Sequence, residues 1–408
     1  MKIAQINVTY GKASTGRTCK ELSDFLTSKG VNVVTFSASC GKKYKENKIF
    51  ESKISRLKHL MLSRITGLEG YYSFGATKKL VKELLNFNPD IVHLRILHGS
   101  YLNYGYLYKK IREMKIPVVW TMHDCWAYTG KCAYYSNLNC FKWKDATCSK
   151  CPAKKQYPES LFFDFSNYMY KRKNELFNSI SDLHIVTVSD WLKCEVEQSY
   201  LNQFDIRRIY NWIDLDVFQP RESNKLKLKY PNRFIILGVA SAWSSRKGID
   251  KFIELSKYLA DNYLIILIGK CNVRLPNKRI VSVDNISSKN ELSEYYSLAN
   301  VFINFSEEET FGKVAAEAIS CGTPVITNSN TANPEIIDNR CGIVLKNGNM
   351  EEVLEAIKKI ESNKKLFYSN ACVKRANKLF NKSINCELYY SLYLDLIDKG
   401  KGVDGIGN

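Results

Sequence analysis

The sequence lacks a long hydrophobic run. No window approaches the roughly 18 uninterrupted apolar residues that mark a membrane-spanning helix, and the densest windows, 234–240 and 264–269, have the length of a strand. Residues 1–8 alternate apolar and polar side chains and lack the continuous apolar stretch and small-residue cleavage site of a signal peptide. These absences favour a cytoplasmic protein without a transmembrane span, whose cysteines are reduced.

Acidic residues are fewer than basic residues. The 408 residues include 41 Asp and Glu against 60 Lys and Arg, which gives a formal net charge of +19. Such a field favours polyanions, acidic membrane surfaces or phosphorylated substrates as partners, and by itself it does not choose among them. The content of 45% hydrophobic and 12% aromatic residues argues against a disordered chain.

No repeat of fixed period is evident. Short β-branched runs instead alternate with longer helical patterns, which is typical of βα units and parallel sheets. The expected strands form two series: 2–8, 31–37, 90–94, 117–123 and 184–189, then 234–240, 264–269, 280–283, 301–305, 324–327 and 342–345. We therefore predict an α/β fold of two Rossmann-like, doubly wound domains facing across a cleft, with ligands at the carboxyl ends of the strands.

The domain boundaries follow from the same pattern. We expect an N-terminal domain at 1–205 and a C-terminal domain at 206–380. A helix that packs back on the body is expected at 381–398, and a flexible tail at 399–408.

The segment 306–326 carries the sharpest motif. It follows an expected strand, turns at Gly312, continues as an Ala-rich helix and stops at 322–324. A glycine turn before a helix N-terminus is an anion site, because free backbone N–H groups and the helix dipole both favour phosphate there. Glu309 and Glu317, which have seven residues between them, are acceptors for sugar or ribose hydroxyls. The spacing alone is equally compatible with an ordinary acidic helix start.

This segment resembles the signature of the family 4 glycosyltransferases, which are retaining nucleotide-sugar enzymes of GT-B fold. Their E-x7-E motif continues into a helix of small residues and G-x-P-V, and Glu309 to Glu317 followed by 322–325 matches it in register. The resemblance implies that Glu317 holds the ribose hydroxyls. It also implies that the donor's sugar and phosphates are met by Glu309 and by the backbone at Phe311, Gly312 and Lys313.

A second match lies at 238–250, directly after an expected buried strand. The family places two cations on the donor diphosphate here, and Lys247 in a Lys-Gly pair supplies one of them. Ala242 stands where the usual Arg would be, and Arg246 is the candidate to replace it. Two cations suit this position because the leaving diphosphate gains negative charge as the glycosidic bond breaks. A solvated Arg-Lys pair at a helix start is the alternative.

The N-terminal half carries further matches. The loop at 11–17, with Gly16, resembles the glycine-rich loop by which family members border the cleft and bind the donor, although a pair of glycines is also common in simple turns. His123 ends an expected strand, where the family commonly has a His that faces the donor sugar. We regard His123, which orients the sugar or acts as a base, and Glu309 as the catalytic candidates. A lone His is otherwise structural or solvated.

Thirteen cysteines are present, and five crowd into one stretch inside an insertion near 125–152. Four of these, Cys132, Cys140, Cys148 and Cys151, are enough for a tetrahedral structural zinc site, and the last two have the C-x-x-C spacing of a zinc knuckle. Four reduced, partly buried thiols are the alternative. No catalytic metal is expected. The surrounding H-D-x-W-x-x-T-G-x-C pattern resembles a subgroup of these transferases found in capsule, O-antigen and colanic-acid synthesis.

The stretch 52–65 places Ile54, Leu57, Met61 and Ile65 on one helical face and basic residues on the others. A basic amphipathic helix of this type binds anionic membranes. Most amphipathic helices simply cover a core, which is the alternative here.

The sequence predicts a retaining glycosyltransferase that moves a hexose from a nucleotide-diphosphate sugar to a lipid-linked oligosaccharide in bacterial surface polysaccharide synthesis. It is expected to be peripheral on the inner face of the cell membrane and to bind no nucleic acid. Two alternatives stay open: a nucleotide-sugar epimerase of GT-B-like shape, and a zinc-containing nucleic-acid-binding protein.

Overall fold

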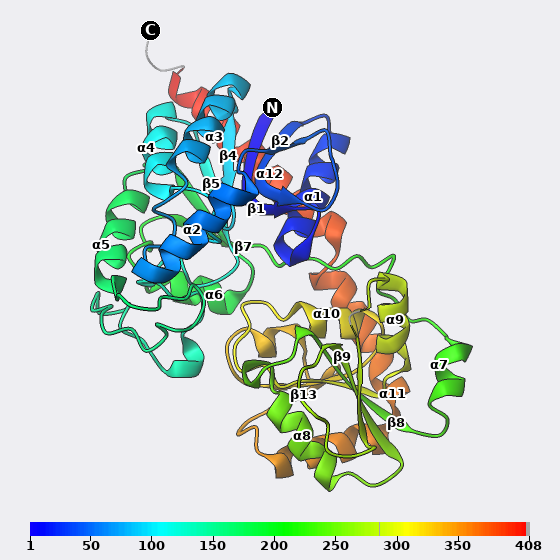
Figure 1. Cartoon of the computed structure of the whole chain (residues 1–408). Coiled ribbons are helices and arrows are strands. Elements are labelled where there is room, and N and C mark those ends of the chain that lie inside the picture. Colours follow the sequence, from blue (N-terminus) through cyan, green and yellow to red (C-terminus); the bar gives the residue numbers. More distant parts are fainter. Residues whose placement is uncertain (285, 405–408) are drawn as a thin grey trace. The chain divides into compact units, whose positions relative to one another are not determined.

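The computed structural model describes residues 1–284 and 286–404, and the chain divides into two compact units (Figure 1). Unit 1 comprises Met1–Ile209 and Cys386–Asn408, and unit 2 comprises Tyr210–Asn385. The change of unit after Ile209 falls slightly beyond the position expected from the sequence.

Unit 1 contains a seven-stranded sheet of order β3-β2-β1-β4-β5-β6-β7, in which every neighbouring pair is parallel. Its strands are β1 Lys2–Tyr10, β2 Asn32–Cys40, β3 Asn47–Ile49, β4 Ile91–Leu94, β5 Val118–Met122, β6 Leu183–Thr187 and β7 Asp205–Arg208. Its helices are α1 Ala13–Ser28, α2 Lys53–Thr66, α3 Phe74–Phe87, α4 Tyr104–Met114, α5 Ser166–Phe177 and α6 Asp190–Glu197, with a short helix η1 at Ser136–Leu138.

Unit 2 repeats this plan with a six-stranded parallel sheet of order β10-β9-β8-β11-β12-β13. Its strands are β8 Phe234–Ala242, β9 Tyr263–Lys270, β10 Ile280–Val283, β11 Val301–Asn304, β12 Val325–Asn328 and β13 Gly342–Leu345. Its helices are α7 Asn224–Lys229, η2 Ser245–Lys247, α8 Ile249–Tyr258, α9 Lys289–Leu298, α10 Lys313–Ser320, η3 Asn333–Ile336 and α11 Met350–Leu379, which is interrupted at Lys364. The last helix, α12 Lys382–Asp404, begins in unit 2 and continues in unit 1.

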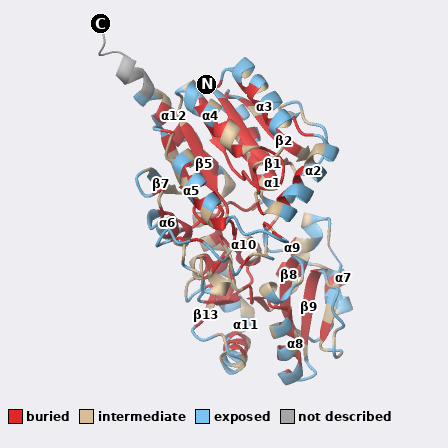
Figure 2. Cartoon of the chain, turned by 60° about the vertical axis from the view of Figure 1, so that its left-hand side comes forward, coloured by how far each residue is buried: buried red, intermediate tan, exposed pale blue. Residues whose placement is uncertain are grey.

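The strands are the buried layer of each unit, and the helices expose their outer faces (Figure 2). All residues of β4, β5, β11 and β12 are buried. Parallel strands that are covered on both faces are rich in apolar, β-branched residues. These strands follow that rule except at a few polar positions such as His93, Thr121 and Asn304. The predicted fold class of two Rossmann-like, doubly wound units is confirmed.

The C-terminal segment differs in extent from its prediction. The helix expected at 381–398 continues to Asp404, so the stretch 399–404 that we expected to be tail is helical. Residues 405–408 of the predicted tail lie outside the described residues.

Candidate functional site

Both sheets reverse their strand order at the centre, between β1 and β4 in unit 1 and between β8 and β11 in unit 2. In open parallel sheets, ligands bind outside the carboxyl ends of the strands at such a reversal. The segments that follow these four central strands, together with the neighbouring β5, carry most of the residues that the sequence singles out. We describe the two units separately, starting with unit 2.

The loop between β11 and α10 is fixed by buried amides. Asn304 at the end of β11 donates to Asn333 (Nδ2 to Oδ1, 2.8 Å), and Asn333 donates to the carbonyl of Ser306 (3.1 Å). The loop ends at Gly312, whose left-handed φ of 87° begins α10 and favours glycine. The first N–H groups of a helix have no acceptor within the helix, so this turn presents donors for an anion.

Glu309 in this loop forms an ion pair with Lys247, which follows β8. The same ammonium group is 3.4 Å from the hydroxyl of Ser306. The backbone N–H of Glu309 donates to Thr331 Oγ1 (3.0 Å), and its carbonyl accepts from Ala332 (3.1 Å). The ion pair thus joins the two segments that flank the strand-order reversal.

Arg246 lies beside this pair. Its guanidinium donates to the carbonyl of Glu308 (3.3 Å), and its own carbonyl accepts from the N–H of Glu307 (3.1 Å). Gly248 makes the close approach possible, because a Cβ there would lie 2.3 Å from the Cβ of Phe305. The structure therefore brings the predicted cations and the predicted glutamate loop into direct contact.

Glu317 projects from the middle of α10 and is 8% exposed. Tyr296 of α9 donates to its Oε2 (3.0 Å), which sequence spacing did not reveal. Burial and the neighbouring Glu317 raise the pKa of Tyr296, so the phenol stays a donor. Phe311 is 4% exposed, and its ring packs on Phe380 and Tyr210. The predicted contact of its backbone with a donor stays a prediction.

The combination of groups in unit 2 suits a phosphorylated ligand that carries hydroxyls. Arg246, Lys247 and the start of α10 at Lys313 supply positive charge, and charged donors make the stronger hydrogen bonds to phosphate. Glu309 and Glu317 only accept hydrogen bonds when ionised, which suits hydroxyl groups.

In unit 1, His123 directly follows β5 and is 9% exposed. Nearby, His98 bridges two residues through both ring nitrogens: Nε2 is 2.7 Å from Asp124 Oδ2, and Nδ1 is 2.8 Å from the hydroxyl of Tyr157. Burial alone would raise the pKa of Asp124, but His98 and the N–H of Trp126 hold it below the usual value. This network was not predicted as a unit, although β4 and β5 are adjacent and their carboxyl ends must meet.

Gly16 lies in the first turn of α1. A Cβ at this position would be 2.5 Å from Thr9 Oγ1 and 3.0 Å from the Thr9 backbone, so glycine allows α1 to approach the end of β1. The carbonyl of Gly16 accepts from the N–H of Gly11 (2.8 Å), which closes the loop. The structure thus gives Gly16 a packing role, and its predicted contact with a donor stays a prediction.

The four cysteines predicted to bind zinc line one cavity of about 10 Å³, together with Gly130, Lys131 and Trp143. Among the described residues, no group of three or more His, Cys, Asp or Glu side chains is arranged to hold a metal ion. The zinc assignment stays a prediction at this point.

The stretch predicted as an amphipathic helix forms α2, and its orientation is unusual. The residues that α2 buries are His59 and Ser63. The predicted apolar face is exposed instead, with exposed fractions from 41% to 70% for Ile54, Leu57, Met61 and Ile65. No helix among the described residues is long and apolar enough to span a membrane.

Comparison with known proteins agrees with this geometry. Residues 15–217 match the family described as Glycosyltransferase Family 4, and residues 220–379 match Glycosyl transferases group 1. A putative colanic acid biosynthesis glycosyl transferase of Escherichia coli (strain K12) is 24% identical over 281 residues, which is 66% of each chain. A capsular polysaccharide biosynthesis glycosyltransferase of Staphylococcus aureus is 25% identical over 244 residues, 53% of this chain and 63% of that protein. The match thus spans slightly less than two thirds of either relative.

Solved structures resemble the whole chain in fold. A sucrose-phosphate synthase from Thermosynechococcus elongatus superposes with a TM-score of 0.69 at 17% identity, covering 98% of this chain and 99% of that one. An Anabaena protein solved in complex with UDP-glucose gives a TM-score of 0.65 at 14% identity, covering 97% and 100%.

Proposed function

We propose, from the premise that the chain belongs to the GT-B glycosyltransferases, that it transfers a hexose from a nucleotide-diphosphate sugar to a lipid-linked oligosaccharide with retention of configuration. The observation that carries the proposal is the contact of Lys247 and Arg246 with the glutamate loop at the start of α10. The similarity to colanic-acid and capsule enzymes supports a role in bacterial surface polysaccharide synthesis.

In this proposal, unit 2 binds the donor. Lys247, Arg246 and the N-terminus of α10 receive the diphosphate, and Glu317 accepts hydrogen bonds from the ribose hydroxyls. The ion pair with Glu309 holds the Lys247 ammonium in place before the donor arrives. During transfer, the cations and the helix dipole stabilise the charge that develops on the leaving diphosphate.

Retention is proposed to proceed without a covalent side-chain intermediate. The bond between the sugar's anomeric carbon and the diphosphate oxygen breaks, and the acceptor hydroxyl oxygen bonds to that carbon on the same face. The leaving phosphate oxygen takes the acceptor's proton. His123 orients the donor sugar in this scheme and need not act as a base.

A binding screen tests the donor assignment. Ligand-observed NMR of the full chain against a panel of UDP- and GDP-sugars identifies a donor, and transfer to a lipid-linked saccharide then tests the reaction. Glu317→Gln should weaken nucleotide binding, whereas Glu254→Gln, an exposed residue of α8, should not. Donor conversion without any acceptor would indicate the epimerase alternative, and an absence of nucleotide-sugar binding would refute the proposal.

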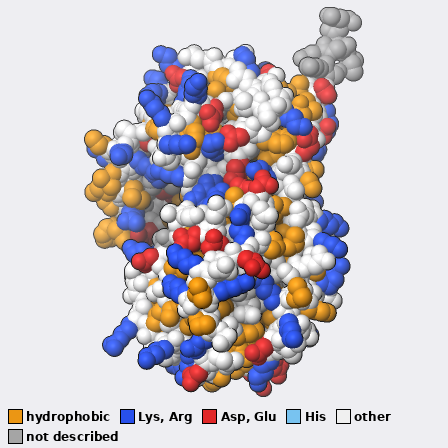
Figure 3. All heavy atoms as spheres, turned by 90° about the vertical axis from the view of Figure 1, so that its right-hand side faces the viewer, with side chains coloured by type: hydrophobic (Ala, Val, Ile, Leu, Met, Phe, Trp, Pro, Cys, Tyr) orange, Lys and Arg blue, Asp and Glu red, His pale blue; other side chains and the backbone are white. Residues whose placement is uncertain are grey.

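The nucleic-acid alternative predicts a basic stripe on one surface. On the face that Figure 3 shows, Lys and Arg side chains are instead spread among acidic and hydrophobic ones. That face therefore does not present the basic stripe that the nucleic-acid alternative predicts.

We also propose that α2 docks on an anionic membrane. The C-terminal end of α2 contacts the segment 157–168, a loop and the first residues of α5, through the hydrogen bond from Leu161 N to Arg64 O (2.7 Å). This segment adds further exposed side chains: Leu161, Phe162, Phe163, Phe165 and Tyr168. Residues 53–68 include Lys and Arg and no acidic residue, which suits anionic lipid headgroups.

Vesicle sedimentation tests this docking. The full chain should bind anionic phospholipid vesicles, and binding should weaken with salt. The double variant Leu57→Gln and Met61→Gln should lose most of the binding, while Leu228→Gln, an 81% exposed residue of unit 2, should not. Equal binding to neutral vesicles, or unchanged binding of the double variant, would contradict the proposal.

A further inference from the structure

The segment between β5 and α5, residues 123–165, contains no regular element except the short helix η1. A connection of this length without secondary structure is uncommon in a compact domain and requires another source of order. Four cysteines spaced along it, Cys132, Cys140, Cys148 and Cys151, line one small cavity. Four thiols, which are soft metal ligands, therefore line one cavity in a segment that has little regular secondary structure to order it.

The four thiols lie close to one another. Cys132 interacts with Cys151, and Cys148 interacts with Cys140 and Cys151. Gly130 allows the chain to pack tightly here, because a Cβ there would lie 2.9 Å from the Cβ of Cys148.

Two buried lysines flank the same thiols. Lys131 is 4% exposed and interacts with Cys132 and Cys151. Lys173 is fully buried and interacts with Cys132 and Cys148. Both side chains are held by backbone carbonyls: Lys131 donates to Lys154, Gln156 and Pro158, and Lys173 donates to Trp126. They therefore stay next to the thiols, where Zn²⁺ with four thiolates would place a net charge of −2.

We propose that Cys132, Cys140, Cys148 and Cys151 bind one structural Zn²⁺, and that Lys131 and Lys173 balance the charge of the centre. Zinc takes four thiolates in tetrahedral geometry, and its binding releases the thiol protons to solvent. Among the described residues no three such side chains are already placed to hold a metal ion, so the proposal requires zinc binding to draw the four thiols together around the cavity. The inference does not depend on the proposed transfer reaction.

The centre also has a consequence for the His98 network. The anchored segment carries Tyr157, whose hydroxyl contacts His98 (2.8 Å). Lys131 holds the same part of the segment by donating to the carbonyls of Lys154 (3.0 Å) and Pro158. Zinc would thus fix a residue that reaches the carboxyl end of the unit 1 sheet.

Metal analysis tests the inference directly. The full chain, expressed without added zinc and purified without chelators, should contain about one zinc per chain. The double variant Cys148→Ser and Cys151→Ser should lose it, and Cys194→Ser, an exposed cysteine of α6, should retain it. A metal-free wild-type protein, or a double variant that keeps its zinc, would overturn the proposal.

Cobalt substitution covers the case in which the double variant does not fold. Wild-type protein loaded with Co²⁺ should show thiolate-to-cobalt charge-transfer absorption and the visible bands of a tetrahedral site. Octahedral cobalt spectra without charge transfer would overturn the four-thiolate assignment.

The lysines provide a separate readout. Lys173→Met should speed zinc loss to a chelator on the order of 10-fold, as is usual when an outer partner of a metal site is removed. Lys171→Met, an exposed lysine two residues earlier on α5, should behave like the wild type. Equal zinc release from both variants would refute the charge-balancing role.

Discussion

At the scale of single residues, the ion pair between Lys247 and Glu309 gives the sharpest test of the donor site. A phosphate must compete with Glu309 for this ammonium group, and the ligand can win because it carries more than one negative charge. We expect Lys247→Met to weaken nucleotide-diphosphate binding on the order of 10- to 100-fold, because a charge-assisted contact contributes about 1.5–3 kcal/mol. Calorimetry measures this, with Lys257→Met, an exposed lysine of α8, as control. Unchanged affinity in Lys247→Met would remove Lys247 from the site.

Asp124 gives a second prediction at this scale, on stability against pH. Its pKa in the folded chain is held below the usual 3.8, chiefly by His98, against the opposing effect of burial. Its stabilising contribution is therefore complete above about pH 3.8 and is lost as the pH falls through the lower folded value. Asp124→Asn should lower the unfolding midpoint at neutral pH and show a smaller further loss between about pH 5 and pH 2.

Denaturant titrations at several pH values measure this effect. Asp216→Asn, an exposed residue of unit 2, serves as control and should follow the wild type. A parallel pH dependence of Asp124→Asn and the wild type would show that the pair with His98 contributes nothing to stability.

The residues that sequence reasoning identified are those whose roles depend on local order along the chain. Glu309, Glu317 and Lys247 follow strands at fixed spacing, so a linear motif contains them. Tyr296 and Tyr157 were missed because they reach the site from other elements, and no linear spacing records which phenol meets which carboxylate or imidazole. Only the strand order, which decides which segments meet at the carboxyl end of each sheet, could have indicated these contacts.

At the scale of elements, periodicity predicted α2 but not its orientation. The stripe of Ile54, Leu57 and Met61 is equally compatible with a covered face and an exposed one, and only the burial of His59 decides the question. The short strands β3 and β7 were missed for a different reason. Both lie at the edges of the sheet and contain polar residues, so they lack the apolar run that marks the central strands.

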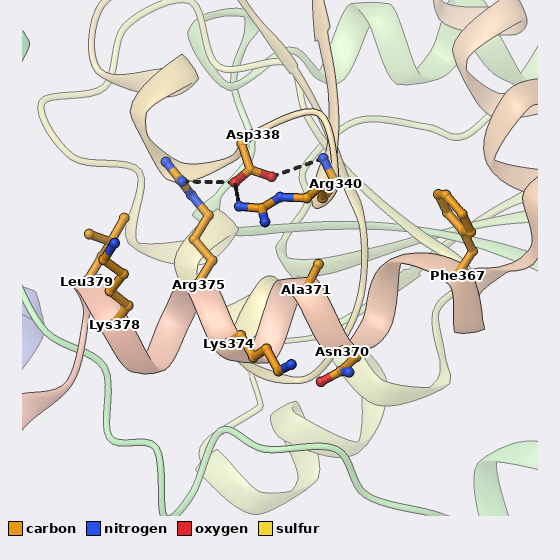
Figure 4. A pocket seen from close by; sticks show the side chains of 9 residues that line it. All are labelled: Asp338, Arg340, Phe367, Asn370, Ala371, Lys374, Arg375, Lys378 and Leu379. Atoms are coloured by element: carbon orange, nitrogen blue, oxygen red, sulfur yellow. Dashed lines mark hydrogen bonds and ion pairs between the residues drawn. The ribbon is translucent and has the colours of Figure 1, made fainter.

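An element-scale prediction concerns the contact of η3 with α11. Arg375 of α11 donates to the carbonyls of Glu335 and Ile336 (both 2.8 Å) and to Asp338 (3.3 Å), at a cavity of about 540 Å³ (Figure 4). A hydrogen bond with Arg340 lowers the pKa of Asp338 to about 2, so this carboxylate stays ionised. The guanidinium of Arg375 is therefore already engaged in holding η3.

Arg375→Lys should lower the unfolding free energy of unit 2 by about 1–3 kcal/mol, because one ammonium group cannot replace the planar set of donors. Arg340→Lys is the matched control: its side chain is 76% exposed, and surface ion pairs contribute about 0–1 kcal/mol. Since Asn333 of η3 also holds the glutamate loop, Arg375→Lys should weaken nucleotide binding as well. Denaturant titration and calorimetry on the same preparations measure both effects, and equal behaviour of the two variants would refute the anchoring role.

At the scale of the whole molecule, the chain changes unit twice, after Ile209 and again within α12 after Asn385. The part of α12 in unit 1 is not a loosely attached end, because its inner face is buried, including Cys386, Leu392 and Leu396. Because this part of α12 packs in unit 1, the stability of unit 1 depends on residues that follow the last strand of its sheet by almost two hundred positions.

A buried polar network makes this dependence measurable. Tyr389 meets Thr121 of β5 (2.9 Å between hydroxyl oxygens), and Tyr393 meets Nδ1 of His93 on β4 (2.8 Å), while His93 Nε2 contacts Thr121 (2.8 Å). Burial lowers the pKa of His93 well below its usual value, so the ring is neutral and each nitrogen has one partner.

Tyr393→Phe leaves His93 Nδ1 buried without its partner, and should lower the unfolding free energy of unit 1 by about 1–3 kcal/mol. Tyr390→Phe, on the less buried side of α12, should change it little. Denaturant unfolding followed by tryptophan fluorescence measures the difference, and a Tyr393→Phe variant as stable as Tyr390→Phe would mean that α12 does not contribute to the stability of unit 1 through this network.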